Sequence, residues 1–153
     1  MTREKIELLQ EELVGLQLAA GHLGYSMERC LNLMDRQELP PEQLERLESL
    51  TSRFARLADL LIQRIFRLID EIELTGSGSL FDRIYRAEKR GWANAAELIK
   101  IRELRNLIAH EYATEKMREI YATVAAMSPA LLATVPKVIE YAGSMIQQYP
   151  EDA

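Results

Sequence analysis

Apolar residues recur at every third or fourth position through the first half of the chain, and this spacing restricts the fold more than any other feature. One stripe covers roughly residues 4–36, and a second runs from about Pro41 to Leu74. Such spacing places the apolar side chains on one face of a helix. The first stripe is Ile6, Leu9, Leu13, Leu16, Ala20, Leu23, Met27, Leu31 and Met34, and the second is Leu47, Leu50, Phe54, Leu57, Leu61, Ile65, Leu68 and Ile72. Because only the short turn ELPPEQ separates them, we expect an antiparallel helical hairpin.

The segment TGSGS, residues 75–79, separates this hairpin (1–74) from a second half (80–148) that carries shorter helical patterns. The markers are Ser79, which caps a helix to about Arg90, Asn94 with Glu97 three residues later, Thr114 as a cap, and Ser128-Pro129 opening a last helix that ends near Gln148. Alternation of period two nowhere lasts long enough for a strand. The sequence therefore predicts one all-α domain over 1–153, a helical bundle in which the long N-terminal hairpin is followed by three to four shorter helices.

Composition agrees with a soluble helical protein. The chain is 48% apolar and 28% charged, with few glycines, prolines and aromatic residues. Its formal net charge of −5 argues against binding nucleic acid through overall charge. A nucleic-acid function therefore requires a local basic surface.

Cysteine and histidine usage limits the chemistry. The single Cys30 has no partner for an internal disulfide and is expected to be a small core residue. Two histidines and one cysteine provide no His- or Cys-based metal set, so we expect no metal and no cofactor. The N-terminus is charged from the start, and we see no apolar run of signal-peptide or membrane length, which favours a cytoplasmic protein without membrane contact.

The octapeptide RNLIAHEY, Arg105 to Tyr112, stands out from the amphipathic pattern. On an ideal helix Arg105 falls at the edge of the apolar sector, where a guanidinium must be paired. His110 points roughly 140° away from Arg105 on the same geometry. Either the helix unwinds around Ala109, therefore, or a second chain supplies the missing partner.

Together an arginine and a histidine suit phosphodiester chemistry. Arginine offers a planar, permanently charged fork of donors that matches phosphate, and histidine exchanges protons near neutral pH. RNA carries its own nucleophile, the 2′-hydroxyl, so these two groups suffice for transesterification without a metal. Spacing alone also fits a structural interpretation, in which Arg105 is partly buried against a carbonyl or carboxylate and His110 is a surface or helix-end residue.

The whole octapeptide resembles the R-x4-H-x-Y signature of the HEPN superfamily, in particular the HepT-like toxins of two-component HEPN–MNT toxin–antitoxin systems. The helical context is similar over roughly residues 80–145, whereas the first half is similar only in being a helical hairpin.

This resemblance implies a small all-α homodimer that cleaves RNA without a metal in a composite cleft. Arg105 would then bind the scissile phosphate, His110 would act as acid and base, and Asn106 would support the site by hydrogen bonding. In HepT-like members the motif tyrosine receives AMP from ATP, transferred by the cognate MNT nucleotidyltransferase, which blocks the cleft. Tyr112 matches that position.

A basic stripe on the second helix is a candidate RNA contact. Five arginines project within an arc of about 80°, along about 30 Å of helix. They are Arg46, Arg53, Arg56, Arg64 and Arg67. Glu42 and Glu71 lie four residues from the ends of this stripe, so an ordinary solvated flank with helix-surface ion pairs is an alternative interpretation.

A different class of function also fits the sequence. The chain would be a non-catalytic helical adaptor or substrate-binding subunit of a nucleotidyltransferase, with Arg105 and Tyr112 in the interface. This alternative predicts a complex that survives the loss of His110.

Overall fold

The computed structural model describes residues 2–75, 78–111 and 114–149. Within these ranges every regular element is a helix, as the all-α prediction requires. The elements are α1 (Thr2–Cys30), α2 (Pro41–Asp59), the π-helical segment η1 (Leu60–Ile65), α3 (Phe66–Ile72), α4 (Leu80–Lys89), α5 (Ala95–His110) and α6 (Thr114–Gln147).

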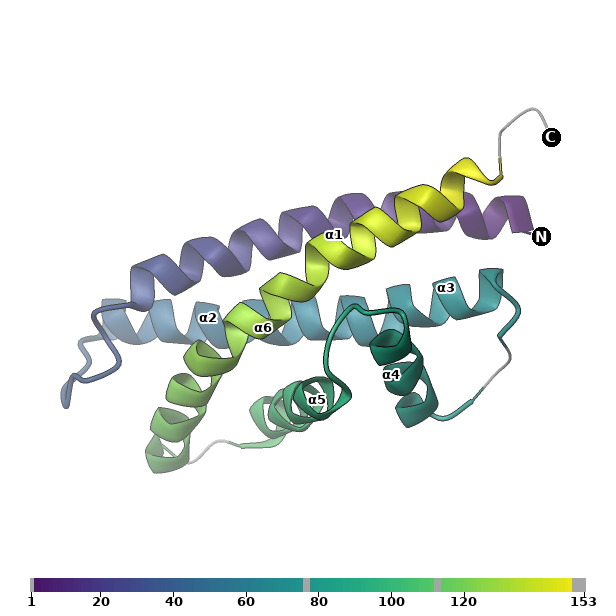
Figure 1. The fold of residues 1–153 in the computed structure, drawn as a ribbon. Coiled ribbons are helices and arrows are strands. Elements are labelled where there is room, and N and C mark those ends of the chain that lie inside the picture. The colour runs from purple at the N-terminus through teal and green to yellow at the C-terminus, as the bar shows by residue number, and fades with distance from the viewer. Residues whose placement is uncertain (1, 76–77, 112–113, 150–153) are drawn as a thin grey trace.

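The predicted hairpin is present, with one boundary corrected. α1 packs along the continuous helix formed by α2, η1 and α3 (Figure 1). α1 ends at Cys30 rather than near residue 36, and residues 31–35 form a turn. The apolar stripe nevertheless continues through this turn, because Leu33 is only 3% exposed.

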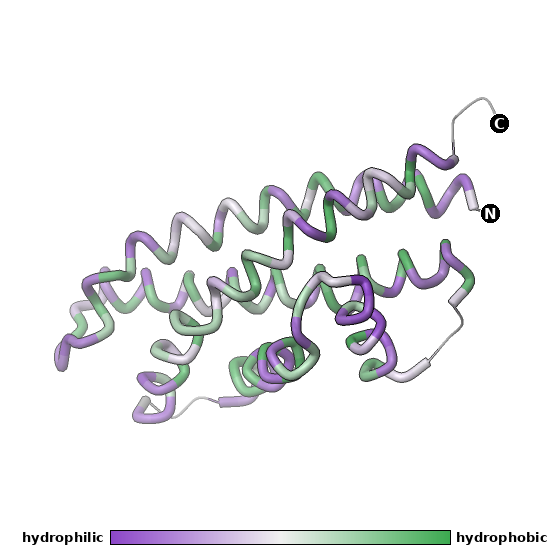
Figure 2. Tube along the Cα trace, in the orientation of Figure 1, coloured by the Kyte–Doolittle hydropathy of each residue, from purple (hydrophilic) through white to green (hydrophobic). Residues whose placement is uncertain are grey.

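The core forms where the apolar faces of all the helices meet, and Figure 2 shows apolar and polar residues alternating along each helix. Cys30 is buried here and its thiol donates to the Arg46 carbonyl oxygen at 3.3 Å, which confirms its expected core position. Trp92 is also buried, 5.1 Å from Phe66 and 5.2 Å from Tyr141 between ring centroids.

The end of the chain differs most from prediction. We expected two shorter helices divided at Ser128-Pro129, whereas α6 is one helix of 34 residues with Pro129 and Pro136 inside it. Proline removes one backbone donor and bends a helix without necessarily ending it. α6 bends across the hairpin in Figure 1, and the Ser128 hydroxyl donates to the Val124 carbonyl oxygen at 2.6 Å just before Pro129.

Packing explains why the prolines do not break α6. Residues on both sides of them are buried, including Val124, Leu131 and Val138, so tertiary contacts outweigh the local preference. Near the other end of the fold, the Arg3 guanidinium donates to the Tyr149 carbonyl oxygen at 3.1 Å, which ties the residue that follows α6 by two positions to the start of α1.

Candidate phosphate-binding site around Arg105

α5 carries the motif, and its start is fixed by an Asn94 cap as predicted. The Asn94 side chain accepts hydrogen bonds from the backbone N–H groups of Ala96 at 2.8 Å and Glu97 at 3.3 Å. Buried Leu98, Ile101 and Leu104 then anchor the helix to the core. Arg105 follows directly after this buried face, so the position of its backbone is set by the packing of α5.

Arg105 forms a bidentate ion pair with Asp59, the last residue of α2. Its Nε donates to Asp59 Oδ1 at 2.7 Å and its Nη2 to Oδ2 at 2.9 Å. These hydrogen bonds raise the pKa of the Arg105 guanidinium above its ordinary value. Nη1 donates to none of the described residues, so this edge of the fork remains available to a second anion.

A pocket of about 330 Å³ opens at this ion pair. Arg64, Arg102 and Arg105 contribute three guanidinium groups to its wall, against one carboxylate from Asp59. The remaining lining residues are Ala58, Ile62, Gln63 and Asn106. Arg105 and Asn106 thus share one pocket. Glu12 lies 3.6 Å from Arg64 outside this lining, so three guanidinium groups face two carboxylates, a balance that still suits an anion such as phosphate.

The π-helical segment η1 forms part of this wall. It begins directly after Asp59 and contributes Ile62, Gln63 and Arg64. π-Helical turns are rare, occur mostly as single turns inside α-helices and are frequent at functional sites. Here the Arg83 guanidinium of α4 donates to the Ile62 carbonyl oxygen at 3.0 Å, which connects the pocket wall to α4.

His110 lies apart from this pocket. It is the exposed last residue of α5, and it does not contribute to the wall that holds Arg105. α5 stays helical through Ala109, so the expected alternative of local unwinding does not occur. A single chain therefore leaves Arg105 and His110 separate, and a shared cleft requires a second chain. Tyr112 lies outside the described residues.

The predicted basic stripe is largely paired within the protein. Arg46 Nη2 lies 2.5 Å from Glu42 Oε1, Arg64 Nη1 lies 3.6 Å from Glu12 Oε1, and Arg67 Nε lies 3.8 Å from Glu71 Oε1. Arg53 Nη1 donates to the Ser26 hydroxyl at 2.8 Å and to the His22 carbonyl oxygen at 3.1 Å. Arg56 is exposed and makes no side-chain hydrogen bond or ion pair to a described residue. The short pairs of Arg46 and Arg53 favour the solvated-flank interpretation for these two residues. The pairs of Arg64 and Arg67 are longer than a hydrogen bond, and both side chains stay largely exposed.

Sequence reasoning missed Asp59, Gln63 and Arg102. A usable signal existed for Asp59, because it is the only acidic residue between Glu48 and Asp70 and the position of Arg105 demanded a partner. Gln63 and Arg102 reach the pocket only through the packing of α5 on the α2–η1 helix, which the periodicity of either helix cannot reveal.

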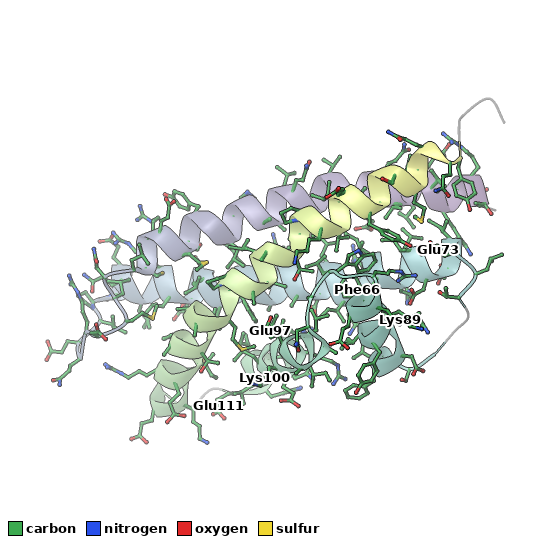
Figure 3. All side chains as sticks on the ribbon, in the orientation of Figure 1. Phe66, Glu73, Lys89, Glu97, Lys100 and Glu111 are labelled. Carbon is green, nitrogen blue, oxygen red and sulfur yellow. The ribbon has the colours of Figure 1, made fainter. Side chains whose placement is uncertain are left out.

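A second, larger pocket of about 560 Å³ lies between α3, the turn before α5 and α6, and none of the predicted site residues lines it. Glu73, labelled in Figure 3, lies at this pocket. Arg90 Nη2 lies 2.8 Å from Glu73 Oε1, and both carboxylate oxygens of Glu73 accept from the Tyr141 hydroxyl. Trp92 lines one side of this pocket and is itself buried.

No known protein-family model matches the chain, and neither a curated protein nor a solved structure matches it. Within the described residues, nowhere do three His, Cys, Asp or Glu side chains gather as a metal site would require.

One prediction about membrane segments needs correction. Residues Glu115–Gln147 of α6 are long and apolar enough to cross a membrane by length and composition, although core helices of soluble proteins pass the same test. The sequence does not show this run clearly, because polar residues and two prolines interrupt it. In the structure its buried face packs against the core.

Proposed function

We propose that the chain is a HepT-like, metal-independent endoribonuclease toxin that acts as a homodimer in the cytoplasm. The observation that supports this most directly is the pocket in which Arg105 and Asn106 of the motif meet Arg64 and Arg102. In this proposal the motif residues keep the roles that the resemblance implies, and a cognate MNT nucleotidyltransferase neutralises the enzyme by transferring AMP to Tyr112.

The proposed reaction uses only groups of the protein and the RNA. The scissile phosphate binds to Arg105 through Nη1, while Asp59 keeps Nε and Nη2. One His110 removes the proton of the 2′-hydroxyl, whose oxygen attacks phosphorus. The bond from phosphorus to the 5′-oxygen breaks, and the His110 of the second protomer donates a proton to that oxygen. The products are a 2′,3′-cyclic phosphate and a 5′-hydroxyl.

Cleavage of labelled RNA in EDTA tests this proposal. Intact mass is measured first, so that a chain carrying AMP is recognised before the assay. We expect unmodified wild-type protein to give cyclic-phosphate ends. Arg105→Ala should lose at least about 100-fold in rate because it removes charge stabilisation at the phosphate, and His110→Ala should lose as much because it removes the acid–base group. His22→Ala is the matched control, because His22 is also exposed on a helix but lies far from the motif in sequence. Equal cleavage by wild type and both site variants would refute the proposal.

The bidentate pair between Arg105 and Asp59 favours a second candidate, the non-catalytic adaptor of a nucleotidyltransferase. In that case Arg105 is a structural residue whose partner is already present. The adaptor predicts no RNA cleavage by an unmodified chain, together with a nucleotidyltransferase complex that His110→Ala leaves intact.

A further inference from the structure

A third pocket, of about 350 Å³, is also rich in positive charge and lies outside the motif. It forms where α3, α4 and the start of α1 meet. Four cationic side chains line it, together with two carboxylates, Leu74 and Gly78. The cations are Lys5, Arg67, Arg83 and Arg86, and the carboxylates are Asp70 and Glu71.

The carboxylates of this pocket do not neutralise its outer cations. Asp70, which is only 3% exposed, is held by Arg86 at 3.0 Å and by Arg90 at 2.7 Å. Glu71 is shared by Lys5 at 3.9 Å and Arg67 at 3.8 Å, distances too long for strong hydrogen bonds. Excess positive charge therefore remains on the solvent side of the pocket.

Arg83 is the half-buried cation of this pocket. Burial and the nearby positive charge of Arg67 lower the pKa of its guanidinium below the ordinary value. Its Nη1 donates to the Ile62 carbonyl oxygen at 3.0 Å, and Ile62 lines the Arg105 pocket. Arg83 thus lines the second basic pocket and contacts one residue of the Arg105 pocket wall.

The two pockets follow one another along a single helix. The Arg105 pocket includes Asp59 and the π-helical segment, and the second basic pocket includes Asp70 on α3. Asp59 and Asp70 are separated by about 16 Å along the helix axis. Arg64 and Arg67, three residues apart, face solvent between them. Arg64 lines the Arg105 pocket and Arg67 lines the second basic pocket, so basic side chains follow η1 and α3 from one pocket to the other and form a basic track. Glu12 lies 3.6 Å from Arg64 and Glu71 lies 3.8 Å from Arg67, beside this track.

We propose that an RNA strand held at Arg105 continues along this track, and that Lys5, Arg67 and Arg83 bind another phosphate of the same strand. This inference deepens the proposed ribonuclease function and rests on it for the orientation of the strand. It assigns RNA binding to the C-terminal part of the predicted stripe and to α4, rather than to Arg46, Arg53 and Arg56. Guanidinium forks lining a narrow basic track suit a single-stranded phosphate backbone.

The test is to measure, by fluorescence anisotropy, how tightly the protein binds a short oligouridylate and its 2′-deoxy counterpart. The deoxy strand cannot be cleaved because it lacks the nucleophile, so affinity is measured independently of catalysis. The test variant is Lys5→Gln with Arg67→Gln, whose exposed ion pairs contribute little to stability. The matched control is Lys100→Gln with Arg56→Gln, which removes the same charge at exposed positions outside both pockets.

We expect the test variant to bind about 5- to 10-fold more weakly than the control. The slope of log K against log salt should also fall by about 0.7 for each phosphate that the protein no longer neutralises. Equal affinity of the test and control variants would overturn the inference, whether or not the wild type cleaves RNA. Weaker binding by the test variant without any cleavage would support the RNA track and refute the ribonuclease. Polyglutamate is added as a competitor at the same concentration of negative charge as the oligonucleotide. If it displaces the strand, the track is a binding site for an acidic protein partner and the inference is overturned.

Discussion

Asp59 is the residue on which the proposed site depends most after the motif itself. It holds two of the three guanidinium nitrogens of Arg105 and so fixes the direction of Nη1. The side chains of Arg105 and Asp59 are 35% and 39% exposed. At ordinary salt concentrations the pair therefore contributes only about 0.5 kcal/mol to the free energy of unfolding. Its main effect is therefore on geometry.

We accordingly expect Asp59→Asn to fold normally and to lose about 10- to 100-fold in kcat, because a loosened guanidinium no longer meets the scissile phosphate in register. KM should change much less, since Arg64 and Arg102 still bind the strand. Steady-state kinetics on a defined RNA measures both values. Glu103→Gln, an exposed substitution on α5, is the control. A variant as fast as wild type would show that Asp59 does not position Arg105.

Gly91 ends α4 in a conformation that other residues adopt only with strain. Its φ is +82°, and the N–H groups of Gly91 and Trp92 donate to the carbonyl oxygens of Glu88 at 2.9 Å and Ala87 at 3.0 Å. This is the hydrogen-bond pattern of a Schellman motif. The turn brings Trp92 directly into the core.

Gly91→Ala should lower the free energy of unfolding by about 1 kcal/mol, because an alanine at positive φ is strained although its Cβ meets no neighbour. Gly143→Ala is the matched control, and it should raise the free energy of unfolding rather than lower it. Gly143 lies inside α6 with open space around its Cβ, and replacement there should add about 0.5 to 1 kcal/mol. Urea unfolding measures both changes, and equal signs would contradict this account.

At the scale of elements, α3 and α4 are joined by a buried charge cluster. Asp70 binds both Arg86 and Arg90 while only 3% exposed. Removing one member of a buried pair leaves an uncompensated charge, which is costly even where the complete pair contributes little. The cluster therefore sets the packing of α4 against α3, and through Arg83 the wall of the Arg105 pocket.

We expect Asp70→Ala to lower the free energy of unfolding by about 3 kcal/mol. Glu71→Gln, one residue further along the same helix, should cost less than about 1 kcal/mol because its ion pairs are exposed. Both variants are compared by the midpoint of urea unfolding. A cost for Asp70→Ala no larger than that of the Glu71 control would mean that the cluster does not join the two helices.

Prediction from sequence succeeded for elements that carry their own periodicity and failed where contacts between elements decide. The stripes of α1 and α2, and the caps Ser79 and Asn94, are local features, and the structure confirms them. The continuity of α6 through Pro129 depends on packing against the hairpin, so the local proline signal misled. The π-helical turn has no mark in the sequence LLIQRI.

The candidate site divides in the same way. Arg105 and Asn106 could be found from the motif because they are near neighbours on one helix. Asp59, Arg102 and the second basic pocket require distant segments to meet, and no spacing within one helix encodes that meeting. The need of Arg105 for a partner was predictable, and Asp59 was a candidate as the only acidic residue between Glu48 and Asp70. The contact between them still depends on how α5 packs on α2, which the periodicity of either helix does not give.

On the scale of the whole molecule, the separation of Arg105 and His110 makes the proposed activity depend on a second chain. Leu107 lies between them on α5 and is 44% exposed. Because Leu107 comes three residues before His110, the two side chains are neighbours on the helix surface. A second copy that covers Leu107 would therefore approach His110 as well. α1 offers another exposed apolar face at Val14 and Leu18, both 60% exposed, but it lies on a different helix from the motif.

These two faces make the dimer hypothesis testable. Leu107→Glu should give a monomer by light scattering at micromolar concentration and should abolish RNA cleavage, because a buried charge at the interface opposes association. Leu18→Glu adds the same charge on the α1 face and should leave both the dimer and the activity intact. A wild-type monomer, or a Leu107→Glu protein that still dimerises and cleaves RNA, would refute the composite cleft. Loss of the dimer with Leu18→Glu alone would instead place the second chain on α1, away from the helix that carries the motif.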